Sequence, residues 1–211
     1  MANAPKLKWL ESGGVNPLDE SPALYEAALS AFAEHTFQEA SLNDILKAAG
    51  MNKGSFYYRF RDKMELYLSL LFRVGTEKMR LFQEHDVSGT SSGFFDEFRN
   101  MALIGLKLAK KDPRFVVFSR RILQEEAQVR ERVIACFGDM RSGLLTDMVE
   151  RAKASGEFRK ELRTETAVYV IETLLNNLDS LIPAEWSDEH ILSAVDQLLD
   201  VIRFGIGGSE A

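Results

Sequence analysis

The spacing of apolar residues along the chain predicts α-helices in nearly every segment. Apolar positions recur three and four residues apart, which is the repeat of one helix face, and no convincing strand pattern interrupts them. Stretches rich in Gly, Pro, Ser or Asp separate the helices. We therefore expect an all-α chain with about nine helices, three in an amino-terminal domain and six in the remainder. The expected helices cover about residues 22–34, 41–49, 52–60, 63–84, 94–111, 113–126, 129–155, 164–181 and 188–204.

Residues 41–66 are the most informative part of this pattern, because they read as two short helices around a tight turn. Ser41 can cap the first helix, and Gly50 stands where a helix ends in the left-handed conformation. Asn52 can cap the second helix, which Phe56 and Phe60 would anchor from below. This is the layout of a helix-turn-helix, which places its second helix in the major groove of DNA.

The outer face of this second helix presents groups that can donate hydrogen bonds to phosphates or base edges. They are Lys53, Ser55, Tyr57 and Arg59. Gly54 is unfavourable inside a helix, which a close approach to DNA or to another helix would explain. A purely structural helical hairpin is the alternative, with Tyr58 in the core and Lys53 simply solvated.

The segment Gly54-Ser55-Phe56-Tyr57-Tyr58-Arg59-Phe60, followed by Lys63 and Leu66, resembles the DNA-binding domain of the TetR family of bacterial transcriptional regulators. The resemblance covers about residues 22–66. It implies that Tyr57 and Lys63 hold phosphates. It also places Ser41, Lys53, Ser55 and Tyr58 at or near the duplex. The full set of DNA-binding residues that we expect is Ser41, Asn52, Lys53, Ser55, Tyr57, Tyr58, Arg59 and Lys63.

Composition predicts the division into domains. Pro5, Pro17 and the pair Gly13-Gly14 predict a flexible tail over residues 1–20. The DNA-binding domain would then cover residues 21–66, and a domain for effector binding and dimerisation would cover residues 67–211. Family resemblance extends to this larger domain in its helical layout alone.

The last two expected helices carry broad apolar stripes that can form a four-helix bundle with a second copy of the chain. A dimer would also supply the two recognition helices that a palindromic operator needs. Burial of both stripes within one subunit is the alternative. The expected dimer residues are Leu174, Leu178, Leu181, Val195, Leu198 and Ile202.

The central helices are rich in aromatic residues, and the family typically holds a small ligand in this region. We expect an apolar or aromatic effector in a pocket that a few polar groups complete. Its expected residues are Phe98, Phe118, Phe137 and Asn177. These aromatics can equally be plain core, and Asn177 can equally make a hydrogen bond across a dimer.

Charge and composition agree with a regulator. The net charge is −6, yet residues 41–63 hold five basic against two acidic side chains, so the rest of the chain carries −9. This asymmetry suits one basic face on DNA. The single Cys136 and the absence of a long apolar run predict a cytoplasmic protein outside the membrane.

Catalysis is not expected, and neither is a cofactor or a metal. The three histidines lie far apart, and carboxylates such as Glu125 stand at helix ends, where solvated charge is the ordinary outcome. The sequence therefore predicts a ligand-responsive regulator that binds double-stranded DNA as a homodimer. We expect it to be a repressor. An activator, or a helix-turn-helix protein that acts through a protein partner, is the alternative.

Overall fold

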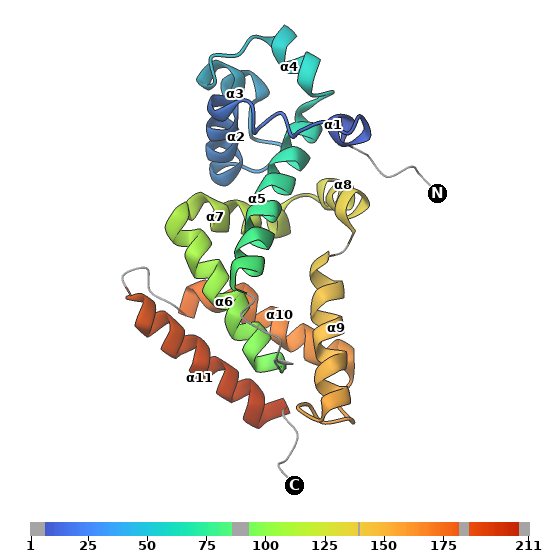
Figure 1. The fold of residues 1–211 in the computed structure, drawn as a ribbon, viewed down its shortest axis with the longest axis vertical. Helices are drawn as coiled ribbons and strands as arrows, with labels where there is room; N and C mark the ends of the chain where they lie inside the picture. Colours follow the sequence, from blue (N-terminus) through green and yellow to red (C-terminus); the bar gives the residue numbers. More distant parts are fainter. Residues whose placement is uncertain (1–6, 86–92, 139, 182–185, 207–211) are drawn as a thin grey trace. The chain divides into compact units, whose positions relative to one another are not determined.

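The computed structural model describes residues 7–85, 93–138, 140–181 and 186–206, and all regular structure in these ranges is helical, as the sequence predicted (Figure 1). None of the described helices is long and apolar enough to cross a membrane. The elements are α1 (Lys8–Glu11), α2 (Pro22–Glu34), α3 (Leu42–Ala48), α4 (Lys53–Arg59), α5 (Lys63–His85), α6 (Phe94–Lys111), α7 (Pro113–Arg121), the 3-10 turn η1 (Ile122–Gln124), α8 (Ala127–Phe137), α9 (Met140–Ser155), α10 (Thr164–Leu181) and α11 (Asp188–Ile206).

The chain divides into two compact units. The first comprises Met1–Gln83 and Lys107–Gly138, and the second comprises Glu84–Leu106 and Asp139–Ala211. The domain boundary expected at residue 66 therefore does not match this division. Most of α5, and the segment that contains α7 and α8, belong with the helix-turn-helix.

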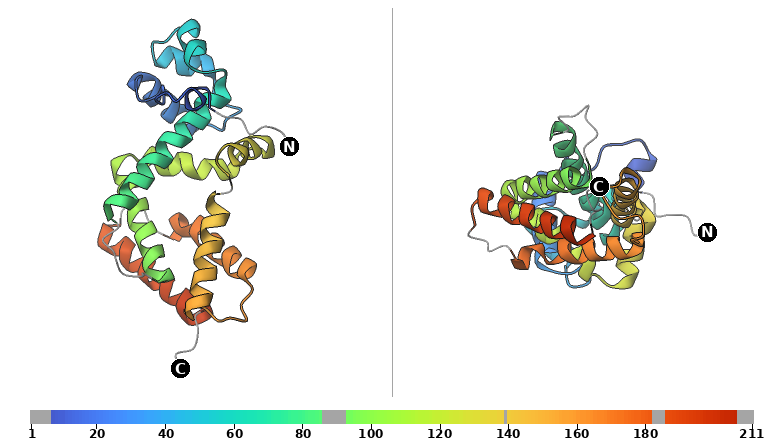
Figure 2. Two further views of the ribbon diagram at one scale, coloured as in Figure 1. Left: turned by 45° about the vertical axis from the view of Figure 1, so that its right-hand side comes forward. Right: turned by 90° about the horizontal axis from the view of Figure 1, so that it is seen from below.

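Local signals at the ends of α3 and α4 act as the sequence predicted. The Ser41 hydroxyl accepts a hydrogen bond from the Asp44 amide at 3.3 Å, and Asn52 Oδ1 accepts one from the Ser55 amide at 2.8 Å. Gly50 has a φ of +61°, which a residue without a Cβ adopts freely. Each cap contributes about 1 kcal/mol to its helix. Figures 1 and 2 show α2, α3 and α4 grouped at one end of α5.

The first unit is built around α2, which packs against both α3 and α7. Four aromatic rings meet in its core with centroids 5.0–6.4 Å apart. They belong to Phe32, Phe37, Tyr67 and Phe118. Burying each such ring contributes a few kcal/mol, so this cluster is a major stabilising element of the unit.

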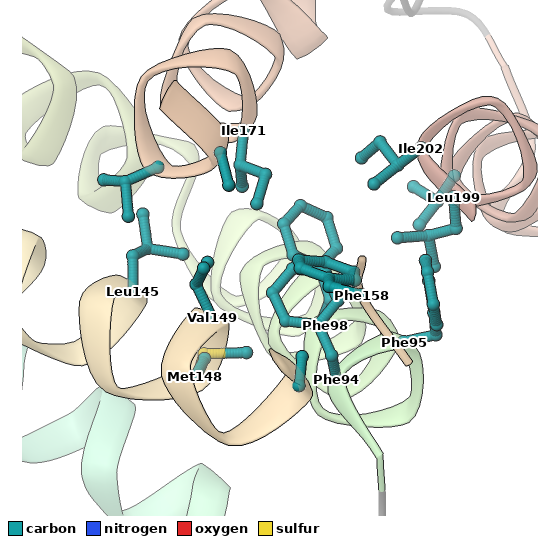
Figure 3. Close-up of a cluster of buried hydrophobic side chains, with 14 residues drawn as sticks. Phe94, Phe95, Phe98, Leu145, Met148, Val149, Phe158, Ile171, Leu199 and Ile202 are labelled. Carbon is teal, nitrogen blue, oxygen red and sulfur yellow. The ribbon is translucent and has the colours of Figure 1, made fainter. Parts of the chain in front are cut away.

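The second unit has a separate core between α6, α9, α10 and α11, shown in Figure 3. Phe94, Phe95, Phe98 and Phe158 gather at its centre, and α9 and α10 pack directly on each other. The surrounding side chains are aliphatic or sulfur-containing and include Leu145, Met148, Val149, Ile171, Leu199 and Ile202.

Two sequence predictions about the fold are wrong. The described part of the expected flexible tail forms α1, and its side chains Leu7, Trp9 and Leu18 are buried. Apolar residues thus override the turn-forming Gly and Pro around them. The single helix expected over residues 129–155 is divided into α8 and α9, because Gly138 takes a φ of +74° and ends α8.

Candidate nucleic-acid interface

Helix α4 has one buried face and one exposed face. Phe56 and Phe60 are fully buried and stacked 5.3 Å apart. Tyr57 and Tyr58 are 52% and 79% exposed, and Lys53 is also exposed. The alternative that Tyr58 belongs to the core is therefore wrong. Two tyrosines and a lysine on one exposed face form a surface that can donate to phosphates and stack on apolar groups.

Gly54 lies on this exposed face near the start of α4. A Cβ placed there would have Asn52 Oδ1, at 3.3 Å, as its one described neighbour within 4 Å. A close approach of another described helix therefore does not explain the glycine. The remaining explanation offered by the sequence is that an external backbone, such as that of DNA, approaches α4 here.

Two of the expected cationic contacts are engaged within the protein. Lys63 Nζ donates to the carbonyl oxygens of Phe37 at 2.6 Å and Ala40 at 2.9 Å, and lies 4.4 Å from the Phe37 ring centroid. Burial lowers the pKa of Lys63, and the charge of Glu125 opposes this shift. Arg59 Nη1 donates to the Ser55 carbonyl at 3.1 Å. An ammonium has three donors, so Lys63 retains one for a phosphate.

Three of the residues expected to contact DNA also take part in, or lie beside, the caps of α3 and α4. The Ser41 hydroxyl and the Asn52 amide oxygen cap α3 and α4, and Ser55 is half-buried at the start of α4. Ser41 and Asn52 are otherwise exposed, so their remaining hydrogen-bonding groups face solvent. The capping bonds fix the positions of both side chains, and Asn52 directly precedes Lys53.

A buried carboxylate that the sequence assigned to solvent holds the loop between α2 and α3. Glu125 is only 2% exposed, and its two oxygens accept hydrogen bonds from the Phe37 amide at 2.9 and 3.0 Å. It also accepts one from the Tyr67 hydroxyl at 3.3 Å. Burial and the Glu125 charge raise the pKa of Tyr67. Phe37 is thus held at its amide by Glu125 and at its carbonyl by Lys63.

The phenylalanines expected to form an effector pocket belong to three different hydrophobic clusters. Phe98 belongs to the core of the second unit, whereas Phe118 packs on Phe32 and Tyr67 in the first unit. Phe137 packs against a different cluster, formed by Leu7, Trp9 and Leu68. One pocket shared by Phe98, Phe118 and Phe137 therefore stays a prediction. The side chain of Asn177 lies outside the described residues.

Dimer residues were also misassigned in part. Val195 and Ile202 are 1% and 3% exposed within their own subunit, so they cannot supply a subunit interface. Leu174 and Leu198 are partly buried, and the side chains of Leu178 and Leu181 lie outside the described residues. The helical repeat predicts an apolar stripe but not which neighbour covers it. Among the described side chains of α10 and α11, the exposed apolar ones are Tyr169, Val170, Val201 and Phe204.

Comparison with known proteins gives a consistent result. Residues 24–70 match the family described as "Bacterial regulatory proteins, tetR family". The probable acrEF/envCD operon repressor of Escherichia coli K12 is 29% identical over 112 residues, which are 53% of this chain and 50% of that protein. The chain thus spans about half the length of that relative.

Solved structures share the fold over most of their length. A TetR family transcriptional regulator from Chloroflexus aurantiacus has a TM-score of 0.72 at 21% identity, covering 90% of this chain and 94% of that one. The regulator FadR from Bacillus subtilis, solved in complex with stearoyl-CoA, has a TM-score of 0.68 at 17% identity, with coverages of 88% and 98%.

Proposed function

This chain belongs to the TetR family of transcriptional regulators, and from this premise we propose that it represses transcription by binding a palindromic operator as a homodimer. The observation that carries the proposal is the exposed face of α4, where Lys53, Tyr57 and Tyr58 stand clear of a core anchored by Phe56 and Phe60. Tyr57 and Lys63 would hold phosphates, while Lys53 and Ser55 would reach base edges.

Geometry makes this face suitable for DNA. The ring of Tyr57 packs edge-on against Phe56 at 5.2 Å, so a buried residue fixes the direction of an exposed hydroxyl. Gly54 leaves the start of α4 open to a close backbone approach. One helix of seven residues reads few base pairs, and two copies about one DNA turn apart would read a palindrome.

Fluorescence anisotropy across a salt series tests the DNA-binding proposal. The wild-type protein should bind DNA from upstream of its own gene more tightly than unrelated DNA, with affinity falling as salt rises. Lys53→Met should reduce this preference about tenfold. Lys160→Met, which removes an exposed charge in the second unit, is the matched control and should leave it unchanged. Equal binding of both fragments by the wild-type protein would contradict the proposal.

Repression itself needs a separate measurement, because an activator would bind DNA in the same way. Transcription in vitro from the upstream fragment should fall as wild-type protein is added, and Lys53→Met should restore it. A rise in transcript would identify an activator. No change despite tight DNA binding would favour action through a protein partner.

For the dimer, we propose the exposed apolar face of α10 and α11 in place of the buried residues. Val201 and Phe204 are 67% and 84% exposed, and large exposed apolar side chains on neighbouring turns are typical of an interface. Val201→Lys should convert a dimer into a monomer in light scattering. Leu144→Lys, an exposed apolar position on α9, is the control and should leave a dimer. A dimer that persists in Val201→Lys would exclude this face.

The effector that we propose is a small apolar or aromatic molecule held in the second unit. The core there consists of apolar side chains on four helices, such as Phe94 and Phe98, together with Phe158 from the segment between α9 and α10. FadR from Bacillus subtilis, whose fold is similar, was solved in complex with stearoyl-CoA, which supports the choice of stearoyl-CoA as a probe. Stearoyl-CoA or free stearate should raise the melting temperature and release the operator fragment. Failure of a panel of apolar molecules to do either would contradict an apolar effector.

A further inference from the structure

The segment Leu7–Asp19, here called the amino-terminal brace, is fastened to α5 by buried side chains. Leu7 and Leu18 are 1% and 0% exposed. Trp9 Nε1 donates to the Ser69 hydroxyl at 2.9 Å. These contacts fix the brace to one side of the helix-turn-helix unit.

A second buried hydrogen-bond network fastens the other end of the brace. Asn16 is 4% exposed, and its Nδ2 donates to the Ser69 carbonyl at 2.9 Å. Its Oδ1 accepts a hydrogen bond from the Leu18 amide at 3.1 Å. Buried polar groups that are all paired specify one arrangement, since any slip would leave them unsatisfied. The brace is therefore a structured part of the first unit, with one defined arrangement.

The brace also reaches the carboxyl end of the recognition helix α4. Lys8 Nζ donates to the Tyr58 carbonyl oxygen at 2.8 Å and lies 6.0 Å from the centroid of its ring. The Lys8 amide donates to Glu65, and Arg61 pairs with Glu11. The last carbonyls of a helix lack partners within it, and a cation there is favoured by the helix dipole. Lys8 thus completes the end of α4.

We propose that the amino-terminal brace is a positioning element of the DNA-binding surface, and that Lys8 is its positioning residue. By holding the Tyr58 carbonyl, Lys8 fixes the last turn of α4, from which Tyr57 and Tyr58 project. The buried anchors Trp9 and Asn16 hold Lys8 in turn. This inference rests on the proposed DNA binding of α4. In it, Lys8 affects DNA binding by positioning the last turn of α4, and it does not itself contact a phosphate.

The brace contacts α8 as well as the recognition helix. Leu7 and Trp9 form a cluster with Leu68, on which Val133 and Phe137 of α8 pack. The Trp9 ring also packs edge-on against Phe72 of α5 at 5.1 Å. The brace therefore contacts α5, α8 and the end of α4 within the first unit.

The test compares Lys8→Met with Lys8→Arg, Trp9→Phe and the control Lys160→Met in operator binding across a salt series. Lys8→Met keeps the length of the side chain but loses its donors, and should weaken binding about fivefold with an unchanged salt slope. Lys8→Arg keeps the charge and the donors, and should bind the operator with wild-type affinity. Trp9→Phe, which changes no charge, should weaken binding about twofold by freeing the brace from Ser69.

In the binding experiment, either of two outcomes would overturn the proposal. One is wild-type affinity in both Lys8→Met and Trp9→Phe. The other is a salt slope reduced by about one in Lys8→Met, which would make Lys8 a direct phosphate contact.

Hydrogen exchange without DNA separates failure of the brace from failure of the proposed function. Amides over residues 57–61 should exchange faster in Lys8→Met than in wild type, and at the wild-type rate in Lys160→Met and Lys8→Arg. Unchanged exchange in Lys8→Met would overturn the brace whatever the DNA result. Faster exchange together with a wild-type protein that prefers no DNA fragment would support the brace and reject the DNA-binding function.

Discussion

The two units of this chain both have aromatic cores, but they differ in what surrounds the rings. In the first unit the cluster of Phe32, Phe37, Tyr67 and Phe118 adjoins the buried Glu125, which pairs with a backbone amide and a phenol. In the second unit the phenylalanine cluster is surrounded by aliphatic and methionine side chains. All four buried polar or charged residues among those described, Asn16, Glu65, Ser69 and Glu125, lie in the first unit.

This difference has a physical consequence for what each unit can do. Hydrogen bonds are directional, and a buried group left unpaired costs more free energy than a pair contributes, so the first unit tolerates one geometry. Apolar contacts are non-directional, so a core of this kind repacks with small losses when its volume is kept. A surface that reads DNA needs the first property. A site that admits an effector is helped by the second.

The largest effect that we expect is from Phe98→Ala, which empties the centre of the apolar core of the second unit. The side chain is 1% exposed, and truncating such a ring costs about 4 kcal/mol in the free energy of unfolding. Phe98→Leu should cost about 1.5 kcal/mol, because it keeps much of the volume and the core is adaptable. Urea unfolding measures both values.

Leu144→Ala is the control for this pair, since Leu144 on α9 is 47% exposed and lies outside the proposed dimer face, so its loss should change stability little. If Phe98→Leu were as costly as Phe98→Ala, the core of the second unit would be as geometrically strict as that of the first. The comparison between the units would then fail.

The next effect is from Glu125→Ala in the polar core of the first unit. The change leaves the Phe37 amide and the Tyr67 hydroxyl without their acceptor, which should cost about 3 kcal/mol. It should also weaken operator binding, because the loop between α2 and α3 leads into the helix-turn-helix. Glu125→Gln keeps one acceptor oxygen and should recover part of both losses. Stability unchanged in Glu125→Ala would mean that the buried bonds do not fix the loop.

The same difference explains how much could be predicted from the sequence. The caps at Ser41 and Asn52, the turn at Gly50 and the anchors Phe56 and Phe60 are local signals, and each was predicted correctly. Their physics involves neighbours within four positions in the chain. A single sequence therefore contains everything needed to place them.

Features that depend on distant partners were missed. Glu125 meets Phe37 across 88 positions, and Trp9 meets Ser69 across 60, so neither the buried carboxylate nor the brace has a local signature. The available signal was a tryptophan and three leucines, two of them now found buried, within a stretch that was interpreted as a tail. Helical periodicity also identified Val195 and Ile202 as apolar without revealing that their own subunit covers them.

A smaller effect is expected from Lys63→Met, which tests whether the loop is held from both sides. The variant loses the bonds to the Phe37 and Ala40 carbonyls, and should lower the free energy of unfolding by about 1 kcal/mol. It should weaken binding to all DNA sequences alike and reduce the salt slope by about one, since the third donor is free for a phosphate. Lys47→Met, an exposed lysine on α3, is the stability control.

The two readouts separate the two roles proposed for Lys63. A stability loss with an unchanged salt slope would assign it to the loop alone. A reduced slope with unchanged stability would mean that its bonds to the loop carbonyls contribute nothing, and that the first unit depends on Glu125 for its loop geometry.

The smallest effect that we expect is from Glu77→Gln, which tests a polar contact near the surface of the first unit in place of one in its core. Hydrogen bonds from Arg80 at 2.8 Å, and from Lys111 at 2.6 Å, lower the pKa of Glu77 to about 2 from an ordinary 4.5. A carboxylate with a lowered pKa stabilises the fold fully above its ordinary pKa, and loses that contribution as the pH falls towards the lowered value. Glu77→Gln should therefore cost about 0.5 kcal/mol at pH 7 and less at pH 3, because solvent screens a surface pair. Melting curves at pH 7, 5 and 3 measure this narrowing gap, with the exposed Glu161→Gln as the charge-matched control. If Glu77→Gln lowered the free energy of unfolding as much as Glu125→Ala does, polar contacts in this unit would be equally strong at the surface and in the core.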